Sequence, residues 1–487
     1  MKKIIYNIAL VSVLFLITSC SNYLDVNTDK NNPETVTPDV LLPSASLWIA
    51  SATGGDLQLI SSIWSQYYAQ NNSSNQYTTV DSYNLNDGNY NSSWSFLYSG
   101  ALEDLKIAND LAVADKRWNY YVASKVLTAF TCHILTDFYG NVPYTDALQG
   151  ESNVTPKLDD SKTVIYPAII AMLDDAISKK GDAETAEELK SMGSFDYLYG
   201  GDIESWIKFA KTLKLKLLMR DFDTNKVGIK ALLDEGDLLT SDAKLDIFID
   251  AADKSNPLYE NDRRKLNTTN NLRGSSTLIN YLNTNSDPRV AVYFGKSSLK
   301  NYLGMPQGSY ALLQPTSAFP TYSKAALAAT DPVYFMSVAE CYFLQAEAYA
   351  RLNDLVNAKT NYDEAVSEAF ARWGFDASTF IAIGGVYEFS ATTPLKSIMT
   401  QKWIAAVRCQ AWDAFFDINR TGYPSIGTQY VGDAGYVLGN LTPSKSSVLP
   451  VGEFPHRMLY PKRSSDYNPN AVDAKKNGLS AKMWWQK

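Results

Sequence analysis

The sequence predicts a mainly α-helical protein built on tetratricopeptide-like helical repeats, with long loop-rich stretches between the helices. Apolar residues recur at spacings of three and four over several segments, which is typical of helices with a buried face. One segment has the spacing of small and aromatic residues found in tetratricopeptide repeats. Stretches rich in Asn, Ser, Gly, Pro and Tyr separate these segments at residues 70–91, 261–330 and 422–470.

The first residues predict a lipoprotein signal peptide over 1–19. Lys2 and Lys3 precede a short apolar run, which lacks the length and the flanks of a membrane anchor. The sequence Ile17-Thr18-Ser19-Cys20 has the pattern of a bacterial lipobox, so we expect Cys20 to be lipidated and to become the mature N-terminus. Two or three acyl chains would anchor the protein stably to a membrane.

Residues 20–43 are expected to be the lipidated N-terminus and a tether, because 25–43 are rich in Asn, Asp and Pro. The single folded body is expected over 44–487. Long helices are predicted at 120–138, 160–177, 204–220 and 396–416. In 204–220 three lysines lie off the apolar stripe, which predicts a surface helix with one buried face; they are Lys208, Lys211 and Lys214.

The clearest repeat unit is predicted at residues 339–370. Small residues there let two helices approach closely, and aromatic residues fill the adjacent groove. Asn353-Asp354 supplies the turn between the two helices. The positions that match the repeat are Tyr342, Ala346, Tyr349, Ala358, Tyr362 and Ala365.

Composition excludes several function classes. The formal net charge of -8 argues against nucleic-acid binding, which requires a basic face. His133 and His456 are the only two histidines, which leaves few histidine-based metal sites and makes a Ser-His-Asp triad improbable. Besides Cys20 the chain has three cysteines, an odd number, and we expect Cys132, Cys341 and Cys409 to be buried without a disulfide.

Sequence motifs for catalysis are absent. The chain has no nucleophile elbow, no H-E-x-x-H and no Walker loop. The acidic pairs Asp159/Asp160 and Asp174/Asp175 are adjacent in sequence and point apart on a helix. We therefore expect a protein that is not an enzyme and needs no cofactor or metal, although a calcium site in an Asp- and Asn-rich loop stays open.

Eight sequence blocks, in order along the chain, resemble the SusD/RagB family of nutrient-binding outer-membrane lipoproteins. One block is D-F-Y-G-N-V-P-Y, in which Asn141 replaces the usual aspartate. Each block alone is weak, but their shared order covers nearly the whole mature chain. The blocks are residues 24–29, 137–144, 206–214, 287–289, 345–348, 401–403, 420–424 and 457–461.

This resemblance implies a SusD-like fold of four tetratricopeptide-like units with a loop-rich second part packed on them. It also implies a protein tethered at the outer membrane of a Bacteroidetes-type cell, facing the exterior. Its implied partner is a SusC-like TonB-dependent transporter, to which it passes a captured nutrient without catalysis. Family ligands are mostly oligosaccharides and, for RagB, peptides.

Tyrosine is unusually frequent, with 31 residues, and aromatic rings provide the flat platforms that sugar rings stack on. The resemblance implies that ligand-binding aromatics come from two regions, near residues 67–90 and 302–322. A peptide ligand would suit the same rings, and a scaffold without its own ligand site is a further alternative. The candidate ligand-binding residues are Tyr68, Tyr77, Tyr83, Tyr90, Tyr302, Tyr310 and Tyr322.

Overall fold

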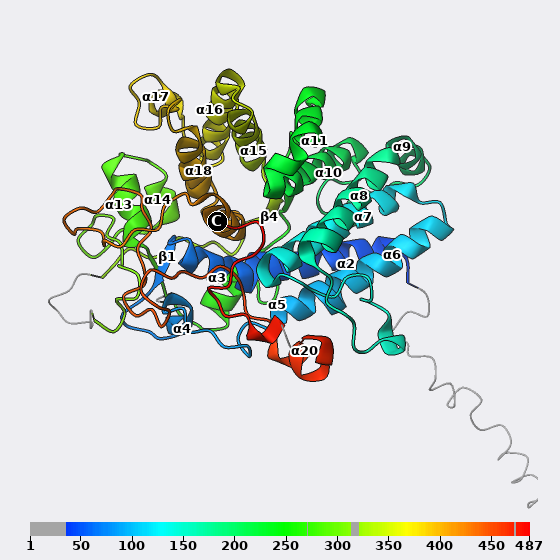
Figure 1. Ribbon diagram of the computed structural model, residues 1–487, viewed down its shortest axis with the longest axis horizontal. Helices are drawn as coiled ribbons and strands as arrows, with labels where there is room; N and C mark the ends of the chain where they lie inside the picture. Colours follow the sequence, from blue (N-terminus) through cyan, green and yellow to red (C-terminus); the bar gives the residue numbers. More distant parts are fainter. Residues whose placement is uncertain (1–35, 270, 313–320, 472–473) are drawn as a thin grey trace, which may run out of the picture.

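The computed structural model describes residues 36–269, 271–312, 321–471 and 474–487 (Figure 1). The predicted signal peptide, Cys20 and most of the predicted tether lie outside these residues. The first described helix, α2, begins at Pro38, so the folded body begins before residue 44. Proline suits the first turn of a helix because its missing N–H has no partner to lose there.

Helices dominate the fold. The N-terminal half contains α2 (Pro38–Ser51), α3 (Leu57–Trp64), α4 (Thr78–Asp81), α5 (Ser92–Ser95), α6 (Glu103–Ala114), α7 (Trp118–Tyr139), α8 (Tyr166–Ser178), α9 (Lys180–Leu189), α10 (Ile203–Leu218) and α11 (Phe222–Glu235). The C-terminal half contains α12 (Pro257–Tyr259), α13 (Ser276–Thr284), α14 (Val290–Tyr293), α15 (Val338–Arg351), α16 (Leu355–Ala371), α17 (Ser378–Ile381), α18 (Pro394–Ala405), α19 (Ala411–Thr421) and α20 (Lys462–Tyr467).

The repeat unit predicted at 339–370 corresponds to the helix pair α15 and α16. Ser337 caps α15 by accepting a hydrogen bond from the Glu340 amide at 3.2 Å. Asp354 caps α16 by accepting one from the Asn357 amide at 3.1 Å. Asn353 forms the turn with a φ of 62°, a left-handed conformation that asparagine tolerates better than most residues.

Two helix predictions need correction. Residues 396–416 form two helices, α18 and α19, because the chain turns between them at Arg408, whose φ is 56°. Helix α10 is not a surface helix with one buried face, since α7, α8, α11 and α15 all pack on it. Lys211 is buried there and pairs with Asp237 at 2.7 Å.

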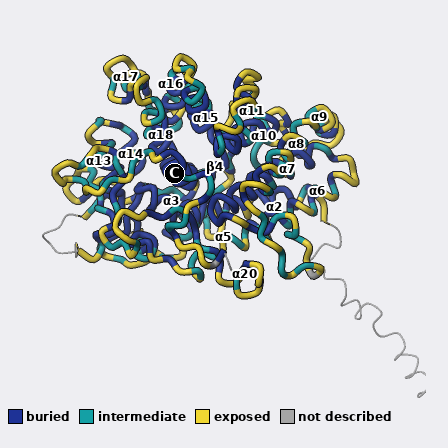
Figure 2. Tube along the Cα trace, viewed as in Figure 1, coloured by how far each residue is buried: buried dark blue, intermediate teal, exposed yellow. Residues whose placement is uncertain are grey.

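The helices form an arc around the upper and right-hand sides of the molecule, and irregular segments fill the left and lower sides (Figure 1). Contacts link α6 to α7, α10 to α11, α15 to α16 and α18 to α19 along this arc. Figure 2 shows that exposed positions gather at helix ends and in the outer loops. Within the described residues, no helix has the length and apolar character needed to cross a membrane.

Two short antiparallel strand pairs connect the helical and irregular parts. Strand β1 (Tyr68–Gln70) pairs with β3 (Leu272–Gly274), with Ala69 opposite Arg273. Strand β2 (Ala243–Leu245) pairs with β4 (Val333–Met336), which leads into α15.

The three cysteines of the body are buried and free, as the odd cysteine count predicts.

Candidate functional site

A buried carboxylate joins the two tyrosine-bearing regions of the sequence. Asp81, at the end of α4, accepts hydrogen bonds from the Gln70 amide, the Gly308 amide and Gln307 Nε2, each at 3.1 Å. Burial raises the pKa of Asp81 to about 7, although the two backbone N–H groups oppose this shift. The loop that carries Tyr310 is therefore fixed to the loop that follows β1.

Strand β3 also holds the segments that carry Tyr302 and Tyr322. Arg273 forms an antiparallel bridge with Lys324, and Ser275 forms a parallel bridge with Met305. The Ser323 amide donates to the Leu303 carbonyl at 2.9 Å. Tyr302 and Tyr322 each precede one of these paired residues, so the two tyrosines lie on neighbouring segments.

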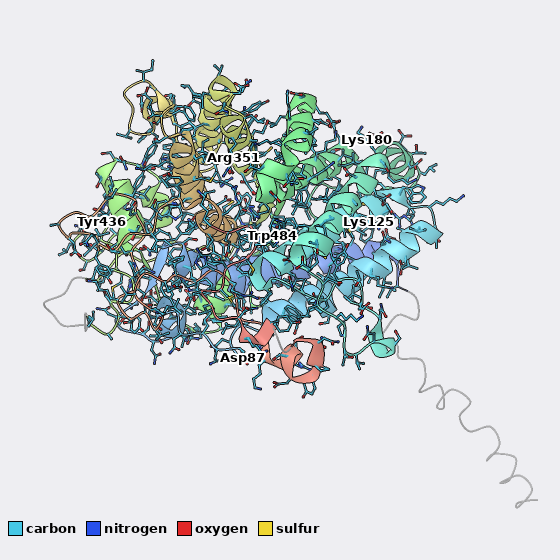
Figure 3. The ribbon with its side chains drawn as sticks, in the orientation of Figure 1. Asp87, Lys125, Lys180, Arg351, Tyr436 and Trp484 are labelled. Carbon is cyan, nitrogen blue, oxygen red and sulfur yellow. The ribbon has the colours of Figure 1, made fainter. Side chains whose placement is uncertain are left out.

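A third loop, between α19 and α20, joins the same surface. The backbone amide of Lys445 donates to the Gln307 carbonyl at 3.0 Å. The side-chain ammonium of Lys445 lies 4.7 Å from the centre of the Tyr430 ring. The hydroxyl of Tyr436 donates to the Asn440 carbonyl at 2.9 Å, and Figure 3 shows this residue at the outer left edge. We call the half-buried rings of Tyr302, Tyr310, Tyr322, Tyr430 and Tyr436 the tyrosine-rich loop surface.

Sequence reasoning did not select Tyr430 and Tyr436. The available signal was the composition of residues 422–470, a long stretch rich in Gly, Pro and Ser, because long irregular segments in a compact protein are usually functional. What the sequence did not show is that this loop packs against Gln307 and Gly308, where Ser446 Oγ donates to the Gly308 carbonyl at 2.7 Å.

Three of the predicted ligand tyrosines belong to the core. Tyr68, Tyr77 and Tyr83 are 1%, 3% and 1% exposed. The Tyr68 ring packs edge-on against Phe294, and the Tyr77 hydroxyl donates to Asp262 at 2.9 Å. Their rings present no open face to a ligand, since the segment around β1 lies between the helices and the loops.

The other four predicted tyrosines are half-buried. Tyr302, Tyr310 and Tyr322 belong to the tyrosine-rich loop surface. Tyr90 lies apart from them, near Asp56, and burial followed by the Asp56 charge raises its pKa above the ordinary tyrosine range. Ligand contact by these four residues stays a prediction.

Several sequence blocks that carry the family resemblance form a buried ion network. Glu347 of α15 pairs with Arg420 of α19 at 2.6 Å. Lys402 of α18 pairs with Asp417 at 2.6 Å and with Asp413 at 2.8 Å, and all five residues are buried. These blocks therefore fix the helices to one another, and the loops provide the surface on which a ligand can be recognised.

Two clefts lie elsewhere on the molecule. One, of about 710 Å³, has Asp56, Phe96, Tyr197 and Glu260 in its wall. The other, of about 650 Å³, is lined by residues that include Arg457 and Trp484. Within the described part of the chain, no group of three or more His, Cys, Asp or Glu side chains has a metal-binding arrangement.

Comparison with known proteins decides the family. Residues 30–461 match the SusD-like family described as starch-binding and associating with the outer membrane. The chain belongs to the SusD-like family. Proteins of this family bind nutrients, are associated with the outer membrane and are described by binding rather than by catalysis. No curated protein matches this SusD-like chain significantly.

Solved structures share its fold. A SusD/RagB family protein from Bacteroides thetaiotaomicron is 24% identical, with 93% of this chain and 99% of that chain covered and a TM-score of 0.69. A chitin-binding SusD homologue from Flavobacterium johnsoniae is 21% identical, with 91% and 98% covered and a TM-score of 0.72. A SusD homologue from Bacteroides uniformis is 22% identical, with 92% and 99% covered and a TM-score of 0.70.

Proposed function

We propose that this SusD-like protein is a cell-surface lipoprotein that captures a nutrient oligosaccharide and passes it to a SusC-like TonB-dependent transporter. Lipidated Cys20 would hold it on the outer membrane, and the transporter would supply the energy for uptake. Capture requires no catalysis, so the oligosaccharide would be released with its glycosidic bonds intact.

The tyrosine-rich loop surface is the observation that supports this proposal most directly. Its five rings come from two stretches far apart in sequence, 302–322 and 430–436, which contacts of Gln307 and Gly308 hold together. Tyrosine provides a flat apolar face and a polar hydroxyl, which match the two kinds of surface on a sugar ring. A chitin-binding homologue with this fold is consistent with a glycan as the ligand.

Calorimetric titration of residues 21–487 with a panel of oligosaccharides and peptides would test the proposal. This form contains the whole described body and lacks only the signal peptide and the lipidated cysteine. We expect a saturable glycan hit, and chromatography of the mixture should show no shorter products. Changing Tyr302 or Tyr322 to alanine should weaken binding by about tenfold or more, since stacked aromatic rings contribute strongly to recognition.

Tyr467 provides a matched control. It is 77% exposed and lies in α20, at the bottom of the molecule in Figure 1. Tyr467→Ala should leave affinity unchanged. If only peptides bind, a RagB-like role is favoured instead. If no member of the panel binds, a scaffold of the transporter complex is favoured.

A further inference from the structure

The segment that carries three of the surface tyrosines has a charge opposite to that of the whole protein. The chain has a net charge of -8, yet residues 263–330 contain eight lysines and arginines and a single acidic residue, Asp287. Asp287 is buried and already paired with Arg289 at 2.7 Å. Arg263 and Arg264 pair with carboxylates outside the segment, so the remaining positive charges are Lys265, Arg273, Lys296, Lys300 and Lys324.

Two of these cations lie directly opposite each other. Arg273 and Lys324 are partners in an antiparallel bridge, so their side chains emerge on the same face of neighbouring segments. Like charges in this arrangement destabilise a strand pair. Among the residues that the structure describes, neither side chain has a carboxylate within 4.0 Å.

Arg273, like Arg457, has no carboxylate partner among the described residues, and in this it differs from three other deeply buried arginines. Arg220, Arg289 and Arg420 each pair with at least one carboxylate. Arg273 is 4% exposed, its Nη1 donates to the Tyr322 carbonyl at 3.1 Å, and its Nε has no hydrogen-bond partner within the part of the chain that the structure describes. A buried cation without a counter-charge is costly to the fold, and a ligand that supplies the negative charge would relieve this cost.

Asp262, the acidic residue that pairs with the neighbouring Arg263, is already engaged. Asp262 pairs with Arg263 at 3.0 Å and accepts the Tyr77 hydroxyl at 2.9 Å. Burial, followed by the charge of Arg263, lowers the pKa of Arg273 to about 10. Burial, followed by the charges of Arg273 and Arg263, lowers the pKa of Lys324.

The positive charges lie among the tyrosines. Arg273 is bonded to the backbone of Tyr322, and the ammonium of exposed Lys296 lies 6.0 Å from the centre of the Tyr302 ring. The sequence between Tyr310 and Tyr322 contains no Asp or Glu. Aromatic platforms and unpaired cations therefore occur together on one part of the surface.

We propose that the tyrosine-rich loop surface selects an acidic oligosaccharide, whose carboxylate or sulfate groups pair with Arg273 and Lys324 while its sugar rings stack on Tyr302 and Tyr322. This proposal rests on the proposed function and names the class of its ligand. Arginine binds carboxylate and sulfate oxygens through parallel N–H donors, and the adjacent lysine adds a second charge.

Matched acidic and neutral glycans would test this assignment. The probes are short oligogalacturonates and chondroitin sulfate oligosaccharides, each compared with its carboxyl-reduced and desulfated neutral counterpart. Calorimetry with residues 21–487 should show that at least one acidic probe binds about tenfold or more tightly than its counterpart, as expected for a charged contact. Raising the salt concentration should reduce that difference, because ions screen exposed charges.

Lys324→Gln should remove most of the preference for the acidic probe. Lys324 is exposed, so this change leaves the core intact. Arg273→Met would test the buried residue opposite it, and thermal melting would show whether that variant is folded. Lys125→Gln is the matched control, because Lys125 also lies beside a tyrosine, 5.2 Å from the Tyr121 ring, and Figure 3 shows it on the opposite side of the molecule from Tyr436.

The possible outcomes separate this proposal from the proposed function. Equal binding of acidic and neutral glycans, with Lys324→Gln unchanged, would overturn the acidic preference and leave glycan capture standing. Selective binding of acidic peptides with no glycan bound would overturn both. An acidic preference lost in Lys324→Gln and retained in Lys125→Gln would establish the assignment.

Discussion

Arg420 holds Glu347 through two parallel hydrogen bonds, Nη1 to Oε1 and Nη2 to Oε2, both at 2.6 Å. The pair links α19 to α15, and both side chains are buried. Arg420 also donates to Asp417 at 2.7 Å. Because this network uses the sequence blocks 345–348 and 420–424, those blocks join helices in this protein and do not identify a ligand.

Glu347→Gln should destabilise the protein by about 3 to 5 kcal/mol, the usual cost of removing one partner from a buried ion pair. Arg420 would lose a carboxylate while remaining buried. Chemical denaturation followed by circular dichroism would measure this change. Asp110→Asn removes an exposed pair with Lys106 and should leave the unfolding midpoint unchanged; an equal loss in both variants would contradict the role given to the buried pair.

Acid should unfold the protein through this network and through the buried pair of Asp137 and Arg220, which are 2.8 Å apart. Burial alone would raise the pKa values of Glu347 and Asp137. The charge of Arg420 instead lowers the pKa of Glu347 to about 2, and the charge of Arg220 lowers the pKa of Asp137 to about 2. In the unfolded chain these groups titrate near their ordinary values of 4.5 and 3.8. Their stabilisation is therefore present above about pH 5 and lost as pH falls toward 2.

The free energy of unfolding, measured across this pH range, should fall steeply below pH 4 in the wild-type protein. The fall should be smaller in Glu347→Gln, because one of the responsible groups is absent. A parallel pH dependence in the two proteins would show that Glu347 contributes nothing to acid unfolding.

Asp81→Ala should weaken ligand binding without removing a surface tyrosine. The change leaves the amides of Gln70 and Gly308 without their acceptor, and unsatisfied buried donors cost about 1 to 3 kcal/mol each. Gln307 Nε2 keeps its bonds to the Ile63 and Tyr68 carbonyls. Hydrogen exchange at residues 70–82 and 303–310 should become faster, while α15 and α16 should keep their protection. Unchanged exchange in the loops would contradict their attachment through Asp81.

Cys20→Ala should prevent lipidation and release the protein from the membrane fraction. The predicted lipobox provides the only lipid attachment that we expect. Metabolic labelling with palmitate followed by membrane fractionation would measure both effects. Ser21→Ala changes the neighbouring residue and should retain the label; membrane association without label in Cys20→Ala would contradict lipid anchoring.

The helical part of this protein was largely predictable from sequence. Regular spacing identified the helices near 120–138 and 160–177 and the repeat pair α15–α16, because burial of one helix face leaves a local periodic pattern. The prediction of one helix over 396–416 was wrong because the left-handed turn at Arg408 leaves no periodic signal. The burial of α10 depends on helices that are distant in sequence. The lysines of α10 therefore predicted a more exposed helix than the structure contains.

The sequence by itself determined the family, the helical fold and one of the two regions in which the surface tyrosines occur, residues 302–322. Tertiary structure decided which tyrosines face outward, since the exposure of Tyr68 and of Tyr322 depends on what packs over each ring. It also placed Arg273 opposite Lys324, 51 positions away along the chain. Burial and the pairing of distant charges depend on long-range contacts, which composition and local spacing do not encode.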